Sequence, residues 1–329
     1  MLRFFRSVSV IIGALGVARC FAQPLPSLQT PCGTAVPTER AYSLRLSSFA
    51  PRPQQASGLL LQARINGGPP LHLLLDSGAA HITLDARASA KSAVATVSEL
   101  YLAGAGGSPS RLARSGVAGV VEVGPLQFRN CRVDMASGGL AGGIDGVMPM
   151  SIFGSFLIRL DLSGKTLDLL PYPDSGAIQT AGFAHAVLKN DLLFLRGLLN
   201  DELEGHILVD TGASYSAISR RTAHVLKSSP ISVVDLRGAN GAVNADLIAG
   251  GIRFQVAGQN LTAQPVVALD LSAFSALNGV DTIGILGYPD LRSSILTISY
   301  RDALVRIDAR SNDVISPTLI ADERTAGAR

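Results

Sequence analysis

Two near-identical stretches carry residue types suited to acid–base chemistry: LLLDSGA at 73–79 and ILVDTGA at 207–213. In each stretch an apolar run ends in an aspartate that is followed by a hydroxyl residue and a glycine. A carboxylate at the end of a buried strand has little water around it, so its pKa can be perturbed. Asp76 and Asp210 are therefore the candidate catalytic residues.

Two carboxyl groups that lie close together cannot both ionise easily, so at mildly acidic pH they share one proton. The ionised member is a general base that can activate water, and the protonated member can stabilise the oxygen that develops on a carbonyl group. Each role is worth roughly 10²–10⁴ in rate, and the two apparent pKa values belong to the pair. We therefore expect hydrolytic chemistry that uses no metal and no cofactor.

The residues after each acid also have a physical reason to be there. Ser77 and Thr211 carry short hydroxyl side chains that can hydrogen-bond across a twofold axis and lock the two loops together. Gly78 and Gly212 permit tight turns and leave backbone N–H groups free to approach the carboxylates. These four residues are the expected support of the catalytic loops.

A second pair of matching segments shows that the chain is an internal duplication. Residues 144–170 align with residues 282–308, which places Gly146 over Gly284. The aspartate motifs are 134 residues apart and the glycines 138, so the second half carries four additional residues between the two matches. Two similar lobes related by a pseudo-twofold axis would bring the equivalent acids together.

Strands and turns dominate both halves, which predicts an all-β fold with few short helices. Short apolar or alternating runs are separated by Gly, Pro, Asn and Ser, and one short helix per half is expected, near 150–156 and near 287–292. The expected divisions are a signal peptide at 1–22, an N-terminal extension at 23–56, a first lobe at 57–172, a linker at 173–182, a second lobe at 183–310 and a flexible tail at 311–329.

The N-terminus has the layout of a secretory signal peptide. Basic residues precede an apolar run at 8–18, and cleavage is expected after the small residue Ala22. Cys20 follows Arg19, which fits a lipidation site poorly. No later segment approaches the ~20 apolar residues of a membrane span. We expect an exported protein, periplasmic or secreted, with an uncleaved N-terminal anchor as the alternative.

Two cysteines remain after the signal segment, Cys32 and Cys131. In an oxidising compartment they can form one disulfide. The alternative is two unpaired thiols, with Cys131 buried on a strand.

The two aspartate motifs, each followed at a distance by a glycine-bearing segment, DGVM at 145–148 or IGIL at 283–286, resemble the aspartic protease family. Ala79 and Ala213 make the chain most similar to the retropepsin-like branch, and both lobes lie in one polypeptide as in bacterial and pepsin-type members. The resemblance covers roughly residues 57–310. It implies the acid-protease β-barrel fold, hydrolysis of an extended polypeptide substrate, and activity as a monomer.

The same resemblance implies glycine-bearing hairpins, or flaps, that close over the substrate. Residues 102–110 and 236–244 lie where these flaps are expected, and glycine permits the turns and motions of a lid. The candidate flap residues are Gly104, Gly106, Gly107, Gly238 and Gly241.

The first lobe departs from the family pattern at two places. Ala80 stands where the second lobe keeps Ser214, and Met148-Pro149 stands where the second lobe has Leu286-Gly287. With Ala at 79, 80 and 213, fewer hydroxyl groups are available to stabilise ionised carboxylates. The expected rate optimum is therefore nearer pH 4–6 than pH 2.

Two other functions for these residues fit the sequence less well. Ser77, His81 and Asp85 are the residue types of a nucleophilic triad, but the spacing and the absence of a nucleophile elbow argue against one. His72 and His206 occupy matched strands with no third metal ligand near them in sequence.

Three other functional classes fit less well. The net charge of +3 is scattered, which argues against a nucleic-acid partner. Paired carboxylates also serve glycosidases, yet no Trp is present for stacking on sugars. A peptide-binding module that keeps the fold without catalysis is the main alternative, and the presence of both acids argues against it.

Overall fold

The computed structural model describes residues 32–50, 57–102, 104–105, 111–140, 143–173, 178, 182–238 and 241–309. The predicted signal peptide, with Cys20, and the predicted tail at 311–329 lie outside these residues. Within the described part of the chain, no helix is long and apolar enough to cross a membrane.

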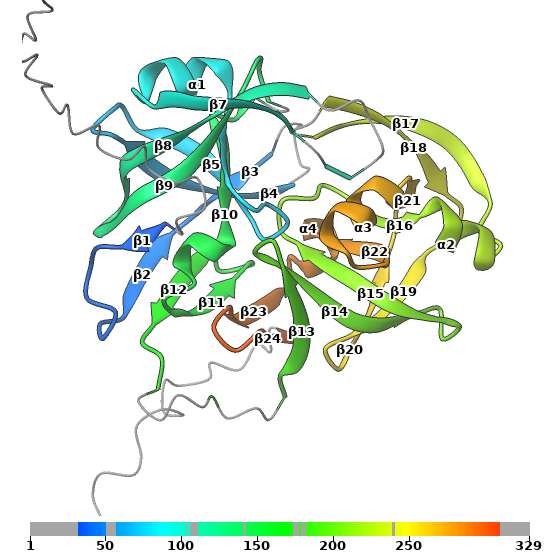
Figure 1. Ribbon diagram of the computed structural model, residues 1–329. Helices are drawn as coiled ribbons and strands as arrows, with labels where there is room; N and C mark the ends of the chain where they lie inside the picture. Colours follow the sequence, from blue (N-terminus) through cyan, green and yellow to red (C-terminus); the bar gives the residue numbers. More distant parts are fainter. Residues whose placement is uncertain are drawn as a thin grey trace, which may run out of the picture.

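The described residues are mostly β-strand, as the sequence predicted (Figure 1). The first half contains β1 (Gly33–Thr34), β2 (Tyr42–Arg45), β3 (Ser47–Phe49), β4 (Gly58–Ile65), β5 (Leu71–Asp76), β6 (Ile82–Leu84), α1 (Ala86–Lys91), β7 (Ala95–Leu102), β8 (Arg111–Val123), β9 (Leu126–Ala136), β10 (Gly146–Pro149), the 3₁₀ helix η2 (Met150–Phe153), β11 (Leu157–Asp161) and β12 (Thr166–Leu170). The second half contains β13 (Ala184–Lys189), β14 (Leu192–Leu199), β15 (Leu203–Asp210), β16 (Ser216–Ser219), α2 (Arg220–Val225), β17 (Pro230–Gly238), β18 (Gly241–Ile248), β19 (Ile252–Val256), β20 (Gln259–Ala263), β21 (Val266–Leu269), α3 (Ser272–Asn278), β22 (Thr282–Gly287), α4 (Tyr288–Leu291), β23 (Ser294–Ser299) and β24 (Leu304–Ala309).

The first lobe is a closed barrel. Its strands pair around a ring in the order β4, β8, β9, β6, β10, β5 and back to β4. Alternation of apolar and polar residues in strands such as β4 directs one set of side chains inward. Leu73, Leu75 and Phe128 are among the fully buried residues of this core.

The second lobe repeats much of this pairing. β15 pairs with β14 and β22, and β16 joins β22 to β21, which in turn pairs with β18. The long β8–β9 hairpin of the first lobe corresponds here to four strands, β18 to β21. Gly250, at φ +75°, lies between β18 and β19, and Pro265 between β20 and β21. Proline cannot donate a ladder hydrogen bond, so it ends a strand.

Three strands from each half form one sheet between the lobes, in the order β2, β12, β11, β23, β24, β13. The two halves meet at the antiparallel pair β11–β23, where Ile158 is opposite Ile298. Side chains from both lobes and from this sheet belong to one continuous core. The two lobes are therefore fixed relative to each other by backbone hydrogen bonds and by burial.

The described part of the predicted N-terminal extension is built into the sheets. β1 pairs with β9, β2 with β12 and β3 with β4. Each of these strands has at most four residues, and β1 and β2 pair with strands that lie far away in the sequence, so their pairing leaves little local signal.

Short helices occur where the sequence predicted them. η2 lies within the predicted 150–156 segment and α4 within 287–292. The sequence did not predict α1, α2 or α3. α1 and α2 have only six residues, although each begins with a recognisable cap: Asp85 accepts from Ala88 N, and Ser219 from Thr222 N.

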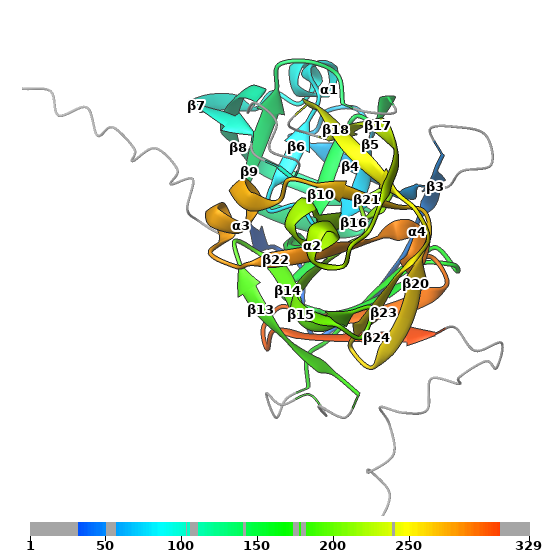
Figure 2. The same cartoon turned by 90° about the vertical axis from the view of Figure 1, so that its right-hand side faces the viewer.

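Two hairpins, β7–β8 and β17–β18, lie on the opposite side of the molecule from the interlobe strands. Figures 1 and 2 both place these hairpins above the barrels and β23 and β24 below them.

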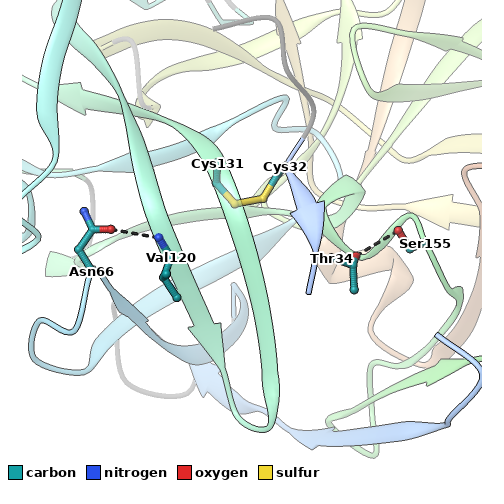
Figure 3. The surroundings of a disulfide bond; sticks show 6 residues. All are labelled: Cys32, Thr34, Asn66, Val120, Cys131 and Ser155. Carbon is teal, nitrogen blue, oxygen red and sulfur yellow. Dashed lines mark hydrogen bonds between the residues drawn. A yellow bond between two sulfur atoms is a disulfide. The ribbon is translucent and has the colours of Figure 1, made fainter. Parts of the chain in front are cut away.

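A disulfide joins Cys32 to Cys131 across 99 residues (Figure 3). It attaches the start of β1 to the middle of β9, and Cys131 is buried. Next to it, Thr34 Oγ1 donates to Ser155 Oγ at 3.1 Å, which also holds the N-terminal strand to the body.

Removing the disulfide should destabilise the protein. A cross-link that closes a loop of this length restricts the unfolded chain, so Cys32→Ala with Cys131→Ala should lower the free energy of unfolding by about 2–5 kcal/mol. Urea denaturation of the double variant and of the reduced wild type should give the same loss. An unchanged free energy of unfolding would show that the bond does not constrain the chain.

Candidate active site

Asp76 and Asp210 occupy equivalent ends of buried strands. Asp76 is the last residue of β5 and is paired with Pro149 of β10; Asp210 is the last residue of β15 and is paired with Gly287 of β22. Both pairs of strands are parallel, so Asp76 and Asp210 lie at the equivalent edge of the sheet in each lobe. Each acid follows apolar residues that are buried in its own lobe.

The two acids face each other across the lobe boundary. A Cβ built on Gly78 would lie 2.5 Å from a carboxylate oxygen of Asp210, and a Cβ on Gly212 would overlap the carboxylate of Asp76. Each carboxylate therefore lies against the glycine of the opposite loop, which leaves no room for a side chain there. The two carboxyl groups are close enough for each to shift the pKa of the other.

The two hydroxyl residues hold the loops together through crossed hydrogen bonds. Ser77 N donates to Thr211 Oγ1 at 3.1 Å, and Thr211 N donates to Ser77 Oγ at 3.0 Å. Each hydroxyl then donates to a carbonyl of the opposite lobe, Ser77 to Val209 O at 2.7 Å and Thr211 to Leu75 O at 2.9 Å. Both side chains are buried, so each hydroxyl both accepts and donates across the interface.

Backbone N–H groups point at the carboxylates. Gly78 N donates to Asp76 Oδ1 at 2.6 Å. Asp210 Oδ1 accepts from Gly212 N at 2.9 Å and from Ala213 N at 3.0 Å. Donors aimed at a carboxylate favour its ionised form.

Burial raises the pKa of both acids. For Asp76 the negative charge of Asp210 and the hydrogen bond between the two side chains add to the effect of burial, so its pKa lies well above the ordinary value. For Asp210 the hydrogen bond from Asp76 and the N–H groups of Gly212 and Ala213 oppose burial. The pair therefore holds one proton over a range of pH in which an isolated aspartate would be ionised, and its two titration steps belong to both residues.

Apolar clusters flank both loops. In the first lobe Leu74 and Val147 pack with Ala79, and in the second lobe the equivalent residues Leu208 and Ile285 belong to a cluster that contacts Ala213. These clusters make the immediate surroundings of both loops apolar, and the partial burial of the two carboxyl groups raises their pKa values.

The candidate flap residues are placed in part. Gly104 is in the loop after β7, and Gly106 and Gly107 lie outside the described residues. Gly238 and Gly241 pair at the end of the β17–β18 hairpin, where Gly241 has φ +126°. Ala105 packs against the second-lobe cluster that Val234 and Leu236 of β17 also contact. The first hairpin therefore reaches the second lobe.

The alternative sites find no geometric support. Ser77 is committed to the interlobe hydrogen bonds and Asp85 caps α1, so these residues do not form a triad with His81. His72 lies near Asp145 with its side chain 58% exposed. Among the residues that the structure describes, no group of three His, Cys, Asp or Glu is arranged to hold a metal ion.

Known proteins share both the sequence pattern and the fold of this chain. The model of a family described as "Aspartyl protease" matches residues 61–155 and 195–289, one match in each half. The crystal structure of an aspartic proteinase from Irpex lacteus superposes with a TM-score of 0.52 over 83% of this chain and 98% of that chain, at 14% sequence identity. This likeness shows the same fold. The comparison with curated proteins gives no match.

Replacing Asp76 with Asn should stabilise the protein increasingly as the pH rises above about 4. A pKa raised by folding contributes stability below the unfolded value, near 3.8, and this stability is lost as the pH rises through the folded value. Asn cannot ionise, so Asp76→Asn avoids the loss. The difference in Tm between variant and wild type, measured from pH 3 to pH 7, should grow with pH. Asp281→Asn, at a side chain that is 75% exposed, is the control; a flat difference for Asp76→Asn would contradict the assignment.

Thr211→Val should cost about 1–3 kcal/mol in the free energy of unfolding, because it leaves the buried Ser77 N–H and Leu75 carbonyl without their partner. Thr211→Ser keeps the hydroxyl and is the matched control. Chemical denaturation of both variants checks this, and equal losses would show that the hydroxyl contributes nothing.

Proposed function

The chain belongs to the aspartyl protease family and is an aspartic-type peptidase, and from this premise we propose that it is an exported endopeptidase whose catalytic residues are Asp76 and Asp210. The observation that carries this proposal is that each of the two carboxyl groups lies against the glycine of the opposite loop.

The two acids divide the reaction between them. Ionised Asp210 removes a proton from a bound water as the oxygen of that water attacks the peptide carbonyl carbon. Asp76 donates its proton to the carbonyl oxygen, so that a tetrahedral diol forms without a free oxyanion. The proton now held by Asp210 then passes to the amide nitrogen, the C–N bond breaks, and Asp76 recovers a proton from the diol.

The asymmetry of the pair supports these roles. Asp210 accepts two backbone N–H groups of its own loop, which stabilise its charge, while Asp76 accepts one, from Gly78. The hydroxyl groups of Ser77 and Thr211 do not donate to the carboxylates, since both donate to carbonyl groups of the opposite lobe. Fewer hydrogen bonds to the ionised form leave the upper pKa of the pair less depressed. A rate optimum between pH 4 and pH 6 follows.

An extended polypeptide is the substrate class that fits the site. In the described part of the chain, β7 ends the sheet of the first lobe and β17 ends the sheet that contains the second lobe. A strand at the edge of a sheet can pair with a bound peptide. The apolar clusters beside Ala79 and Ala213 favour apolar side chains near the cleaved bond. Because one chain supplies both acids, the monomer is sufficient for activity.

Export is supported by two independent features. The N-terminal residues have the layout of a signal peptide, and the Cys32–Cys131 disulfide suits an oxidising compartment.

Peptide cleavage should depend on both acids. The mature protein is incubated with a mixed peptide library from pH 3 to pH 7, and the cleavage products are identified by mass spectrometry. Asp76→Asn and Asp210→Asn should each lower kcat/KM at least about 10²-fold, because each removes one proton-transfer role. Asp281→Asn should cleave as the wild type does. The wild-type rate should be highest between pH 4 and pH 6, and a maximum below about pH 3 would contradict the assignment.

The same samples separate catalysis from binding alone. A statine-type peptide should raise the Tm of the wild type, since it resembles the tetrahedral intermediate. If the folded wild type binds this peptide but cleaves nothing, the endopeptidase proposal fails and the protein is a peptide-binding module.

A further inference from the structure

A chain of three hydrogen-bonded residues lies beside Asp210 in the second lobe. Gly287 N donates to Ser216 Oγ at 2.9 Å, and Ser216 Oγ donates to Asp290 Oδ2 at 2.5 Å. Ser216 is completely buried, and Gly287 is paired with Asp210 across β15 and β22. Asp290, in α4, is thus connected through one hydroxyl to the backbone opposite Asp210.

The loop that carries Asp210 rests directly on this backbone. Tyr288 N donates to Ala213 O at 3.0 Å. A Cβ built on Gly287 would lie 2.5 Å from the carbonyl oxygen of Tyr215 and 3.0 Å from that of Ala213. A displacement of Gly287 would therefore move the loop that follows Asp210.

The first lobe lacks these hydrogen bonds, although the path of its backbone is equivalent. The internal alignment places Ile82 at the position of Ser216, Pro149 at Gly287 and Ile152 at Asp290. Proline has no N–H to donate, and isoleucine has no atom to accept it, so the three replacements are consistent with one another. Ile82 and Ile152 are buried, and Pro149 is paired with Asp76. The first lobe has Met148-Pro149 where the second lobe has Leu286-Gly287. At this position the first lobe is therefore held by apolar packing and the second lobe by hydrogen bonds.

We propose that Ser216 and Asp290 are positioning residues that hold Gly287, and through it the Asp210 loop, in the geometry needed for peptide hydrolysis. The inference rests on the proposed catalytic role of Asp210. Neither residue needs to touch the substrate, since both act through the backbone of Gly287.

Asp290 is needed because a hydroxyl has a single proton. When the carboxylate accepts that proton, a lone pair of Ser216 Oγ is directed at Gly287 N; without this acceptor the hydroxyl can rotate and donate elsewhere. Arg292 is the charged group that acts on Asp290. The strands packed against α4 are β16, β20 and β22, and they carry no ionisable side chain.

The test compares Ser216→Ala, Asp290→Ala and Asp290→Asn with Ile82→Val and Ile152→Val, the matched changes in the first lobe. Steady-state kcat and KM, the pH profile of kcat, and Tm are measured on one cleaved peptide. Ser216→Ala and Asp290→Ala should lower kcat about tenfold, because a displaced Asp210 loop stabilises the transition state less well, with KM within about twofold, and should change the pH profile. Asp290→Asn keeps an oxygen that accepts the Ser216 proton and should retain kcat within about twofold of the wild type. The two first-lobe variants should lower Tm only.

Three results would overturn the proposal. The first is a wild-type kcat and pH profile in folded Ser216→Ala and Asp290→Ala. The second is a loss in Asp290→Asn as large as in Asp290→Ala, and the third is an equal loss in Ile152→Val. If Ser216→Ala does not fold, the two Asp290 variants decide alone, because that side chain is only partly buried. Wild type and Asp210→Asn are assayed first on the same peptide, so failure of the catalytic proposal shows as no cleavage by the wild type.

Discussion

The crossed hydrogen bonds between Ser77 and Thr211 are the interaction on which the site depends. They join two loops from different lobes. They hold these loops together although the neighbouring acidic side chains repel each other when both are ionised. The rest of the fold holds the two loops in contact. Each barrel delivers one strand end to the lobe boundary, and the sheet that contains β11 and β23 fixes the distance between the barrels.

A symmetric backbone carries a chemically asymmetric pair. The two loops have the same sequence pattern and the same crossed contacts, yet Asp210 accepts two backbone N–H groups of its own loop and Asp76 accepts one. The difference continues below the loops, where Pro149 lies opposite Asp76 and Gly287 opposite Asp210. A duplicated chain can let its halves diverge in this way, and a homodimer of identical chains cannot.

The sequence was enough to predict the parts of the structure that the duplication repeats. It predicted the two-lobed β fold, the short helices η2 and α4, and the importance of the matched Asp-hydroxyl-Gly segments. It did not predict that β2 joins the interlobe sheet, because a four-residue strand takes its identity from a distant partner. The link between Ser216 and Asp290 was missed for the same reason, as it spans 74 residues and has no copy in the first half. The catalytic roles and the flaps stay predictions.

The central claim, that Asp76 and Asp210 hold one proton between them, can be tested directly by ¹³C NMR of the aspartate carboxyl carbons. Spectra from pH 2 to pH 8 would be assigned by comparison with Asp76→Asn and Asp210→Asn. The account predicts that both signals follow the same two titration steps, the upper one well above the ordinary range of an aspartate, and that the upper step disappears in either variant. Two independent titrations near the ordinary value would contradict it.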